Sequence, residues 1–496
     1  MSSSIIVLAL VLPPLIGALL IVAFALDAPR RAQGLAISSC LISFGAAVLA
    51  LRVCANGGTL EYAYGGWPAP FGIAARVDGI GAPIVAMIAA VATAVFVYAG
   101  RSLEAELPRN RPASFAMGLL LTGALQGMST TADLFNLYVF LEISSLSAYT
   151  LIALGGGAAS LATFRYLIIG TVGASFYLLG IAYLFALTGT LNAADVAMAL
   201  GQLELSPALL TGMALLTVGL GLKMSIFPLH GWLPDAYTYA PSTTSALVGG
   251  LMTKVAALAL LRVLYGVFVA VHGGILPAIG DVLSALGAVG IVFGSVMALA
   301  QRDLKRLLAY SSVAHLGMIA VGLGLGNDLG IQGAVFHMLA HGVAKATLFL
   351  IAGGVAYRLG SRNLDSLAGL HKTMPLSTAA FVVAALSMIG IPPTAGFFSK
   401  WYLILGCLEA GRMDLFAVIV GSTLLTAWYF LRLFETIFFT KPSVKTHREE
   451  LPMSMLAPIA TGAAAILVIG LTNQYTIESL IGKAPILTAL SEMASR

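Results

Sequence analysis

Charged residues are scarce in this chain of 496 residues. Asp, Glu, Lys and Arg make up 9% of it, whereas soluble globular proteins carry about 25%. Hydrophobic residues make up 59%. So few charges cannot cover a surface that faces water, and this excludes an ordinary soluble protein. The composition therefore predicts that most of the surface faces lipid.

Cysteine is also rare, and the three cysteines, Cys40, Cys54 and Cys407, stand singly. Without a CxxC pair or a ligand cluster, neither a disulfide framework nor an iron–sulfur site is supported. A GxGxxG nucleotide-binding motif is missing too, because GLGLGND near Gly322 has the wrong spacing. We expect no cofactor and no bound metal. The net charge of +5 is explained by membrane topology and needs no nucleic-acid partner.

Long apolar runs are what the chain does have. A hydrocarbon core of ~30 Å needs about 20 residues of helix, and lipid offers no hydrogen bonds, so each span must be helical. The sequence predicts an all-α polytopic membrane protein with about 14 transmembrane helices. The expected spans are 4–26, 34–54, 79–100, 113–129, 132–154, 164–188, 207–226, 243–266, 275–299, 306–324, 331–357, 375–394, 414–438 and 455–472, with a shorter apolar piece at 398–408.

Basic residues fall mainly on one side of this predicted membrane. The positive-inside rule makes the richer side cytoplasmic, so both termini are expected outside. We call the richer side the basic face. Its lysines and arginines are Arg30, Arg31, Arg101, Arg109, Arg111, Arg165, Arg302, Lys305, Arg306, Arg358, Arg362, Lys372, Lys441, Lys445 and Arg448, against Arg52, Arg76, Arg262, Arg412, Lys483 and Arg496 on the other.

Two parts of the chain show a weak internal sequence similarity, which we call the internal echo. FRYLIIGTVGASFYLLG from Phe164 resembles FHMLAHGVAKATLFLIAG from Phe336, and ISSLSAYTLIAL from Ile143 resembles YSSVAHLGMIAV from Tyr310. An offset of five spans gives the copies opposite orientations, as in the inverted repeats of secondary transporters. We expect an N-terminal three-helix segment (1–110), two inverted five-helix repeats (111–268 and 269–440), and a C-terminal helix and tail (441–496).

Few ionisable residues lie inside the predicted spans. A charge at the bilayer centre costs about 2.5–3.5 kcal/mol on insertion scales, so such residues are functional candidates by default. Lysines near helix ends could instead extend to the interface, and His315 could be a hydrogen-bonded packing residue. The candidates for proton transfer are Glu142, Lys223, Lys254, His315, His337, His341, Lys345 and Lys400.

The spacing of His337, His341 and Lys345 places them on one helical face. Such a polar stripe indicates a hydrated seam. Histidine titrates near neutral pH and can relay protons in both directions. Burial disfavours the charged form of a side chain and a nearby opposite charge favours it, so a Glu–Lys pair that can separate acts as a proton switch. Metal binding by His337 and His341 is the alternative, although no acidic or cysteine partner is near in sequence.

Two proline-containing breaks adjoin buried lysines. In GLKMSIFPLHGWLPDAY, Pro228 removes a backbone donor and disfavours helix before it, which frees carbonyls near Lys223. Pro392 and Pro393 do the same before Lys400. We therefore expect discontinuous helices near 221–235 and 388–402, with these prolines as gating candidates. His230 and Asp235 either deliver protons or cap the turn, and Trp232 and Tyr237 fit an interfacial aromatic belt.

The stretch LKMSIFPLHGWLPDAYTYAPS resembles the signature of the antiporter-like, proton-translocating subunits of respiratory complex I and of Mrp-type Na+/H+ antiporters. TADLFNLYVFLE, LMTKVAAL, AYSSVAHLGM, HMLAHGVAKATLFL and IPPTAGFFSKW match as well, so the resemblance covers essentially the whole chain. DLFNLYVFLE is most similar to the branch formed by the D-type subunits of the multisubunit Mrp antiporters. Lys400 stands where one complex I branch carries glutamate.

The resemblance implies roles for the candidate residues. Glu142 pairs with Lys223 in a first half-channel, and Lys254 connects toward the centre. The central hydrated axis continues through His315, His337, His341 and Lys345, and it ends at Lys400. The stretch LEISSLSAY departs from the usual pattern, because serines replace bulkier residues after Glu142. The resemblance also implies other integral membrane subunits as partners, in a bacterial inner membrane.

Together these features predict a proton-conducting subunit that couples proton flow to export of Na+ or another monovalent cation, without catalysis by the chain itself. One alternative is the same subunit in a complex I type NADH–quinone oxidoreductase or a membrane-bound hydrogenase. Another is a redox subunit that itself binds quinone or metal. Four lysines on one axis repel Na+, so we expect the cation to cross elsewhere, in a partner subunit.

Overall fold

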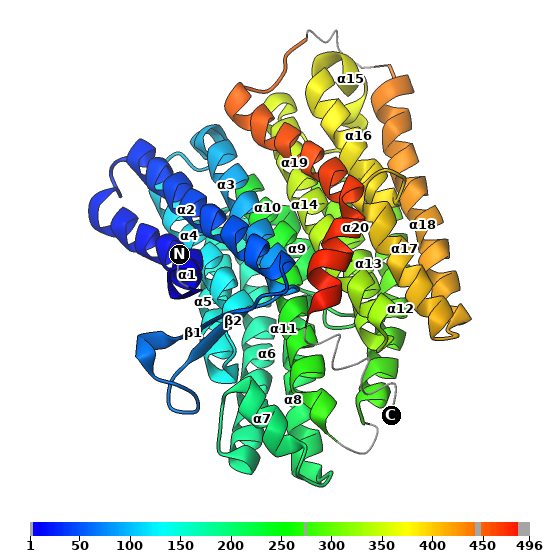
Figure 1. The fold of residues 1–496 in the computed structure, drawn as a ribbon. Helices are drawn as coiled ribbons and strands as arrows, with labels where there is room; N and C mark the ends of the chain where they lie inside the picture. Colours follow the sequence, from blue (N-terminus) through cyan, green and yellow to red (C-terminus); the bar gives the residue numbers. More distant parts are fainter. Residues whose placement is uncertain (1–2, 272–274, 442–447, 485–496) are drawn as a thin grey trace.

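The structure, a computed structural model, describes residues 3–271, 275–441 and 448–484, and it is largely helical (Figure 1). Twelve helices in these ranges are long and apolar enough to cross a membrane. Each of the fourteen predicted spans coincides with a helix. The two spans beyond the twelve are 113–129 and 375–394, where the helices are Arg111–Thr130 and the shorter Pro375–Ile389. Lys445 and Arg496, counted above among the loop charges, lie outside the described residues.

The N-terminal segment holds an element that the sequence did not predict. A two-stranded antiparallel hairpin joins α2 to α3, with Leu60 opposite Val77 and Ala63 opposite Ala74. Leu60 and Val77 are buried in a small apolar cluster with residues of α1 and α2. Each strand has four residues, too few for alternation to stand out in the sequence. The elements here are α1 (Ser3–Phe24), α2 (Pro29–Ala55), β1 (Leu60–Ala63), β2 (Ala74–Val77) and α3 (Gly81–Glu106).

The rest of the chain forms two five-helix units and a C-terminal helix that slants across the second unit (Figure 1). The first unit comprises α4 (Arg111–Thr130), α5 (Leu134–Ala153), α6 (Ala158–Thr188), α8 (Pro207–Met224) with α9 (Leu233–Tyr239), and α10 (Ser242–Leu247) continued by α11 (Thr253–Gly266). The second comprises α12 (Ile275–Leu299), α13 (Leu304–Gly324), α14 (Asp328–Leu359), α16 (Pro375–Ile389) with α17 (Ala395–Glu409), and α18 (Met413–Phe434). The remaining helices are α7 (Ala193–Leu200), α15 (Leu370–Thr373), α19 (Met453–Leu471) and α20 (Asn473–Tyr475).

Equivalent helix starts show that the two units correspond. Asp133 caps the N-terminus of α5 and pairs with Asn192 through an isolated β-bridge. Asp303 caps α13 and pairs with Asn363 in the same way. The two bridges lie roughly 170 positions apart, which is the offset of the internal echo. Because an odd number of spans separates the copies, they lie at opposite faces of the membrane, as an inverted repeat requires.

Equivalent helix ends give the same offset. Arg262 donates to the carbonyl of Ser129 in the last turn of α4, and Arg432 donates to the carbonyl of Leu299 at the end of α12. In both units a guanidinium thus satisfies a carbonyl that a helix end leaves free. This register also corrects one sequence pairing. The stretches that begin at Ile143 and Tyr310 resemble each other, but they are three residues out of register with the helix caps.

Both predicted helix breaks are present. The helix α8 ends at Met224, where Ser225 adopts a left-handed conformation with φ 65°, and α9 begins at Leu233. In the second unit α16 ends at Ile389, where Gly390 has φ 92°, and α17 begins at Ala395. Each break contains a cis proline, at Phe227–Pro228 and Pro392–Pro393. A third irregularity, the π-helical turn η2 (Val248–Met252) between α10 and α11, was not predicted.

The helices that carry the candidate residues form the centre of the molecule. The spans formed by α14, by α10 with α11, and by α13 are the most completely buried, and α14 and α10 lie in the middle of the ribbon (Figure 1). The outer helices α6, α12 and α18 expose large apolar side chains such as Phe164, Val292 and Trp428. The centre is therefore shielded from lipid, which allows polar side chains to stay there.

Candidate functional site

The predicted intramembrane residues lie deep in the structure. The four lysines and three histidines are buried, and Glu142 is half-buried on α5. Three lysines, those at 254, 345 and 400, come from α11, α14 and α17, and the histidines come from α13 and α14. All seven side chains are almost inaccessible, which does not favour the alternative of lysines that extend to the interface.

Lys400 is held by the end of a broken helix. Its Nζ donates to the carbonyls of Met388 (3.1 Å) and Ile389 (2.9 Å), and to the hydroxyl of Thr423 (3.2 Å). Both carbonyls belong to the last turn of α16, where a carbonyl has no partner within its own helix. The C-terminal end of a helix also favours a cation. The break that proline and glycine make in the sequence thus creates the binding position for the lysine.

Lys254 and Lys345 also donate to backbone carbonyls, but these carbonyls do not lie at a helix end. Lys254 donates to the carbonyl of Gly249 inside the π-helical turn, at 2.5 Å. A π-turn changes the regular ladder and leaves such a carbonyl available. Lys345 donates to the carbonyl of Leu308 on α13 (2.6 Å) and to the hydroxyl of Ser311. A buried amine is costly without partners, and both lysines have them.

Lys223 does not form the direct pair that the resemblance implied. Its Nζ donates to the hydroxyl of Ser145 at 2.7 Å, and Lys223 and Glu142 form no ion pair. Ser145 lies three residues after Glu142 on α5, so the two side chains are neighbours on one face. Oε1 of Glu142 is buried and has no hydrogen-bond partner among the described residues. The unusual serine after Glu142 thus holds the lysine in place of the carboxylate.

The histidines form a directed hydrogen-bond chain. The hydroxyl of Ser399 donates to the carbonyl of Gly396 (2.9 Å), so its oxygen accepts from Nδ1–H of His337 (2.8 Å). In a neutral ring Nε2 is then the acceptor, and Nδ1–H of His315 donates to it at 3.0 Å. Nε2 of His315 has no hydrogen-bond partner among the described residues. His315 is therefore a buried packing residue that also forms a hydrogen bond to a second histidine.

His341 extends this cluster without a hydrogen bond to another described residue. Its ring lies parallel to that of His315, with 5.0 Å between the ring centres. Both of its ring nitrogens are buried and have no partner among the described residues. Buried polar atoms in this position are usually satisfied by water. The stripe of His337, His341 and Lys345 therefore fits the hydrated seam that the sequence predicts.

His230 and Asp235 occupy different environments. His230 stacks on Phe227 and meets the edge of Phe293, and its Nδ1 has no partner among the described residues. Asp235 is held between Arg165 (2.9 Å) and Arg306 (3.3 Å). Contacts between a carboxylate and guanidinium groups are among the strong polar contacts of a protein. Asp235 therefore joins α9 to α6 and α13, which favours the structural alternative over proton delivery.

Trp232 and Tyr237 are fully buried, so their assignment to an interfacial belt is wrong. Trp232 stacks on Tyr166 of α6, with 3.8 Å between ring centres, and its Nε1 donates to the carbonyl of Leu222 at 3.2 Å. That carbonyl belongs to the residue before Lys223. The aromatic residues of the break therefore position the end of α8 inside the protein.

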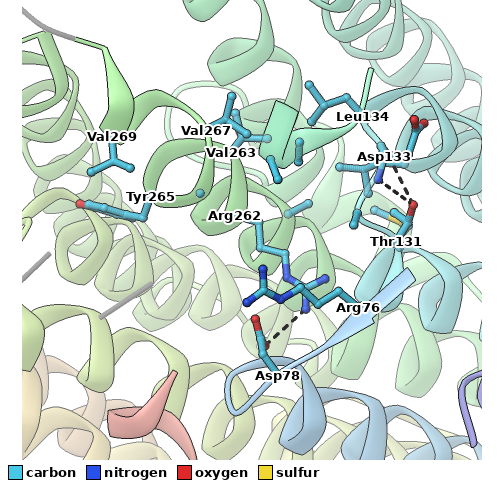
Figure 2. Close-up of a pocket in the computed structure, with 17 residues that line it drawn as sticks. Arg76, Asp78, Thr131, Asp133, Leu134, Arg262, Val263, Tyr265, Val267 and Val269 are labelled. Atoms are coloured by element: carbon cyan, nitrogen blue, oxygen red, sulfur yellow. Dashed lines mark hydrogen bonds and ion pairs between the residues drawn. The ribbon is translucent and has the colours of Figure 1, made fainter. Parts of the chain in front are cut away.

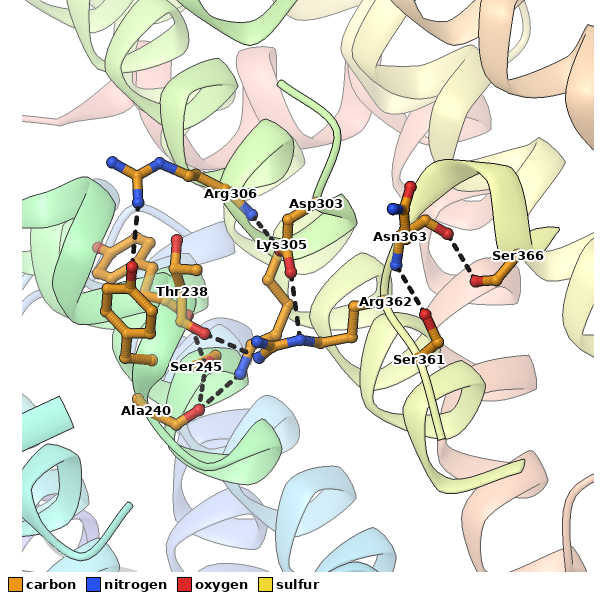
Figure 3. Close-up of polar contacts among 12 residues, drawn as sticks. Thr238, Ala240, Ser245, Asp303, Lys305, Arg306, Ser361, Arg362, Asn363 and Ser366 are labelled. Atoms are coloured by element: carbon orange, nitrogen blue, oxygen red, sulfur yellow. Dashed lines mark hydrogen bonds and ion pairs between the residues drawn. The ribbon is translucent and has the colours of Figure 1, made fainter. Parts of the chain in front are cut away.

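One buried lysine was missed. Lys305 was counted among the loop charges, yet it lies in the first turn of α13 with only 1% of its surface exposed. Its Nζ donates to the carbonyl of Ala240 at the end of α9, at 2.6 Å (Figure 3). The run QRDLKR resembles an ordinary interfacial loop, and nothing local in it distinguishes Lys305 from its neighbour Arg306. Only the packing of α9 against α13 buries it.

A cavity of ≈ 280 Å³ lies at the other face, beside the end of α11 (Figure 2). Arg262 forms an ion pair with Asp78 there, at 3.6 Å. Asp133 also lines the cavity, and burial raises the pKa of its carboxyl, opposed by N–H groups of Asn136 and Phe135. Lys254 lies two turns before Arg262 on α11, or about 12 Å at 1.5 Å per residue. The cavity thus adjoins the helix that carries Lys254.

The chain was compared with known proteins. The model of the family described as NADH:quinone oxidoreductase/Mrp antiporter, TM, matches residues 131–426. The NADH-quinone oxidoreductase subunit N of Desulforudis audaxviator is 47% identical over 90% of this chain and 91% of its own. The D-type subunit of the Na(+)/H(+) antiporter of Alkalihalophilus pseudofirmus is 31% identical over 96% of both chains.

Solved structures agree on the fold. A chain of the membrane-bound sulfane sulfur reductase, an archaeal respiratory membrane complex, is 28% identical, with a TM-score of 0.88 over 99% of both chains. A chain of the Mrp complex from Dietzia sp. DQ12-45-1b has a TM-score of 0.89 over 99% of both chains, at 24% identity. Both are parts of multisubunit membrane complexes.

Proposed function

This chain belongs to the NADH:quinone oxidoreductase/Mrp antiporter family of membrane subunits, and from that premise we propose that its buried lysines and histidines conduct protons. The observation that carries the proposal is the hydrogen-bonded run from His315 through His337 to Ser399, next to Lys400 on α17. The two histidines and the lysine can each release and accept a proton, and the hydroxyl of Ser399 orients the ring of His337. They are shielded from lipid in the centre of the molecule.

In the first unit the proposed switch is the side chain of Lys223. Held by Ser145, the lysine is separated from Glu142, whose Oε1 has no described partner. A lysine away from a carboxylate releases its proton more readily than a paired one. Movement of Nζ from Ser145 to Glu142 would restore the pair and retain the proton. The switch therefore alternates between a hydroxyl and a carboxylate one turn apart.

The host complex that we propose is an Mrp-type antiporter, in which proton flow through this chain drives export of Na+ or another monovalent cation. The 31% identity to a D-type antiporter subunit over nearly the whole chain supports it. The cation crosses in a partner subunit, because the lysines of the axis repel it. In this proposal the membrane is the bacterial inner membrane, with the basic face in the cytoplasm and both termini outside.

A redox-driven host is the second candidate, and the 47% identity to a NADH-quinone oxidoreductase subunit N favours it. The proton path through this chain is the same in both hosts. Purification of the native complex separates them. Flavin, iron and quinone reduction in the purified complex support the redox host, whereas cation/proton exchange by a complex that lacks them supports the antiporter.

Substitution of the switch tests the function itself. Glu142→Ala and Lys223→Ala are expected to abolish proton transport by the complex in liposomes, with the complex still assembled. Glu409→Ala, at an exposed position at the end of α17, is the matched control and keeps full transport. Full transport in both switch variants contradicts the proposal.

A further inference from the structure

Lys305 is buried although it lies in the first turn of a helix, where a lysine side chain could extend into water. The side chain is almost inaccessible, and one carbonyl, that of Ala240, is its hydrogen-bond partner. An ammonium group carries three donors, so two N–H groups stay without a described partner. Burial of a charge is costly unless it is paired. A purely structural contact would be served as well by a neutral donor.

A cavity of ≈ 490 Å³ that opens to the surface adjoins this lysine. It is lined by the end of α3, the junction between α9 and α10, and the end of α14. Its exposed margin includes Glu106, Tyr239 and Gly360, and Lys305 belongs to its lining. The cavity lies on the basic face, because Arg362 also lines it.

The charges around Lys305 come from three elements. Glu106 at the end of α3 accepts the backbone N–H of Ser242 at 2.8 Å, which fixes the start of α10 beside the cavity. Asp303 forms an ion pair with Arg362 at 3.3 Å, and Arg362 also donates to the carbonyl of Thr238 (Figure 3). Asp303 and Arg362 thus neutralise each other. Glu106 remains as the carboxylate that faces the cavity without a cationic partner among the described ion pairs.

Beyond Lys305, helix α13 leads directly to the axis. Leu308, whose carbonyl accepts from Lys345, comes three residues later, or about 4.5 Å along the helix. Ser311 also contacts Lys345, and His315 follows one turn after it. A buried helix thus carries polar contacts at successive turns from the cavity to the histidine cluster. On the described part of α13, the first ionisable group of this series is Lys305.

We infer that Lys305 and Glu106 form the proton-uptake site of this chain on the basic face. The inference rests on the proposed function and adds to it the point where protons enter. Glu106 collects a proton from water in the cavity, and the neutral amine of Lys305 takes it up as ammonium. The ammonium then passes the proton toward the amine of Lys345, and Lys305 returns to its neutral form. Each transfer leaves the number of protons unchanged.

Replacement by arginine separates this role from a structural one. An arginine in this position would keep the positive charge and a donor for the carbonyl of Ala240, but arginine does not release its proton in proteins. We expect Lys305→Arg to lower proton transport by the reconstituted complex about tenfold or more, as for loss of an acid–base group. Glu106→Gln, which keeps an acceptor for Ser242, should also slow transport. Lys372→Arg, at an exposed position on α15, is the control and should have no effect.

A second variant covers the case in which the larger side chain prevents folding. Ser361 lines the cavity, and the three native cysteines are buried. A bulky, membrane-impermeant thiol reagent should therefore block transport in Ser361→Cys but not in the unsubstituted complex. Ser160→Cys, an exposed position at the start of α6, should react without loss of transport.

The outcomes are distinct. Full transport in Lys305→Arg, or in modified Ser361→Cys, overturns the uptake site. If Lys223→Ala abolishes transport in the same preparation, the proposed function still stands. If Lys223→Ala also retains full transport, the proposed function itself is wrong.

Discussion

At the scale of single residues, the hydroxyl of Ser145 is the group that separates Lys223 from Glu142. The sequence identified both ionisable residues, because a charge inside an apolar run is conspicuous. It could not identify the partner of the lysine, since a long flexible side chain reaches several neighbours on α5. The same limit explains Lys305. A lysine at the end of an apolar run looks exposed until another helix covers it.

Removal of that hydroxyl tests the contact. Ser145→Ala removes the hydrogen bond that the charged amine of Lys223 donates to this hydroxyl, a bond worth about 1.5–3 kcal/mol, and Lys223 then turns to Glu142. The restored pair retains its proton, so we expect transport to slow by roughly tenfold or more, as 1.4 kcal/mol corresponds to a factor of about ten. Ser144→Ala is the matched control, because Ser144 is buried beside it and its hydroxyl also bonds the carbonyl of Leu141. Equal transport in the two variants excludes a role for the Ser145 contact.

At the scale of elements, helix interruptions create the lysine sites. The two proline breaks were predicted, because proline removes a backbone donor and disfavours helix at the residue before it. The π-helical turn before Lys254 was not, because VGGLM contains no residue that excludes an α-helix. A π-turn depends on how a helix packs, and here η2 lies against α14. The short hairpin was missed for a similar reason, since tertiary contacts bury one side of it.

Gly390 is the most sensitive point of the second break. Its φ of 92° is one that side chains rarely adopt, and an added Cβ would lie 3.0 Å from Cδ of Lys400. Gly411→Ala is the matched control. Gly411 also has a positive φ, but nothing lies near its added Cβ, so this variant has only the cost of the strained backbone. We expect both alanine variants to lose about 1–2 kcal/mol of stability. Only Gly390→Ala should also lose proton transport, because it displaces Lys400.

Thermal unfolding and transport of the two purified variants check this. Normal transport in Gly390→Ala, at reduced stability, would show that the position of Lys400 is not critical. Loss of transport in both variants would trace the effect to the backbone and not to the lysine.

At the scale of the whole molecule, the two units share their architecture but not their chemistry. The sequence revealed the repeat and its offset, whereas the register came from helix caps that only the structure shows. We propose 111–268 and 269–440 as the bounds of the units. Arg262 and Arg432 are equivalent in this frame, and each satisfies the end of a helix. The histidine cluster belongs to the second unit alone.

This equivalence predicts matched losses of stability. Arg262→Gln and Arg432→Gln each leave a carbonyl at a helix end without its guanidinium partner, and each also removes one further contact, with Asp78 and with the carbonyl of Gln301 respectively. We expect each to cost about 1–3 kcal/mol, the usual penalty for an unsatisfied buried group. Arg412→Gln is the control, since its ion pairs with Asp281 and Asp414 are exposed and such pairs contribute about 0–1 kcal/mol. A melting temperature lowered as much by Arg412→Gln as by the other two would contradict the equivalence.

The most direct test of proton conduction is substitution of Lys345, which lies between the uptake site and the histidine cluster. Proton flux after a pH step is measured in liposomes that contain the intact complex, with Lys345→Met or with Lys372→Met as the exposed control. Methionine keeps the length of the side chain and removes the proton carrier. We predict background flux for Lys345→Met and full flux for Lys372→Met. Full flux in assembled Lys345→Met complexes would contradict conduction along this axis.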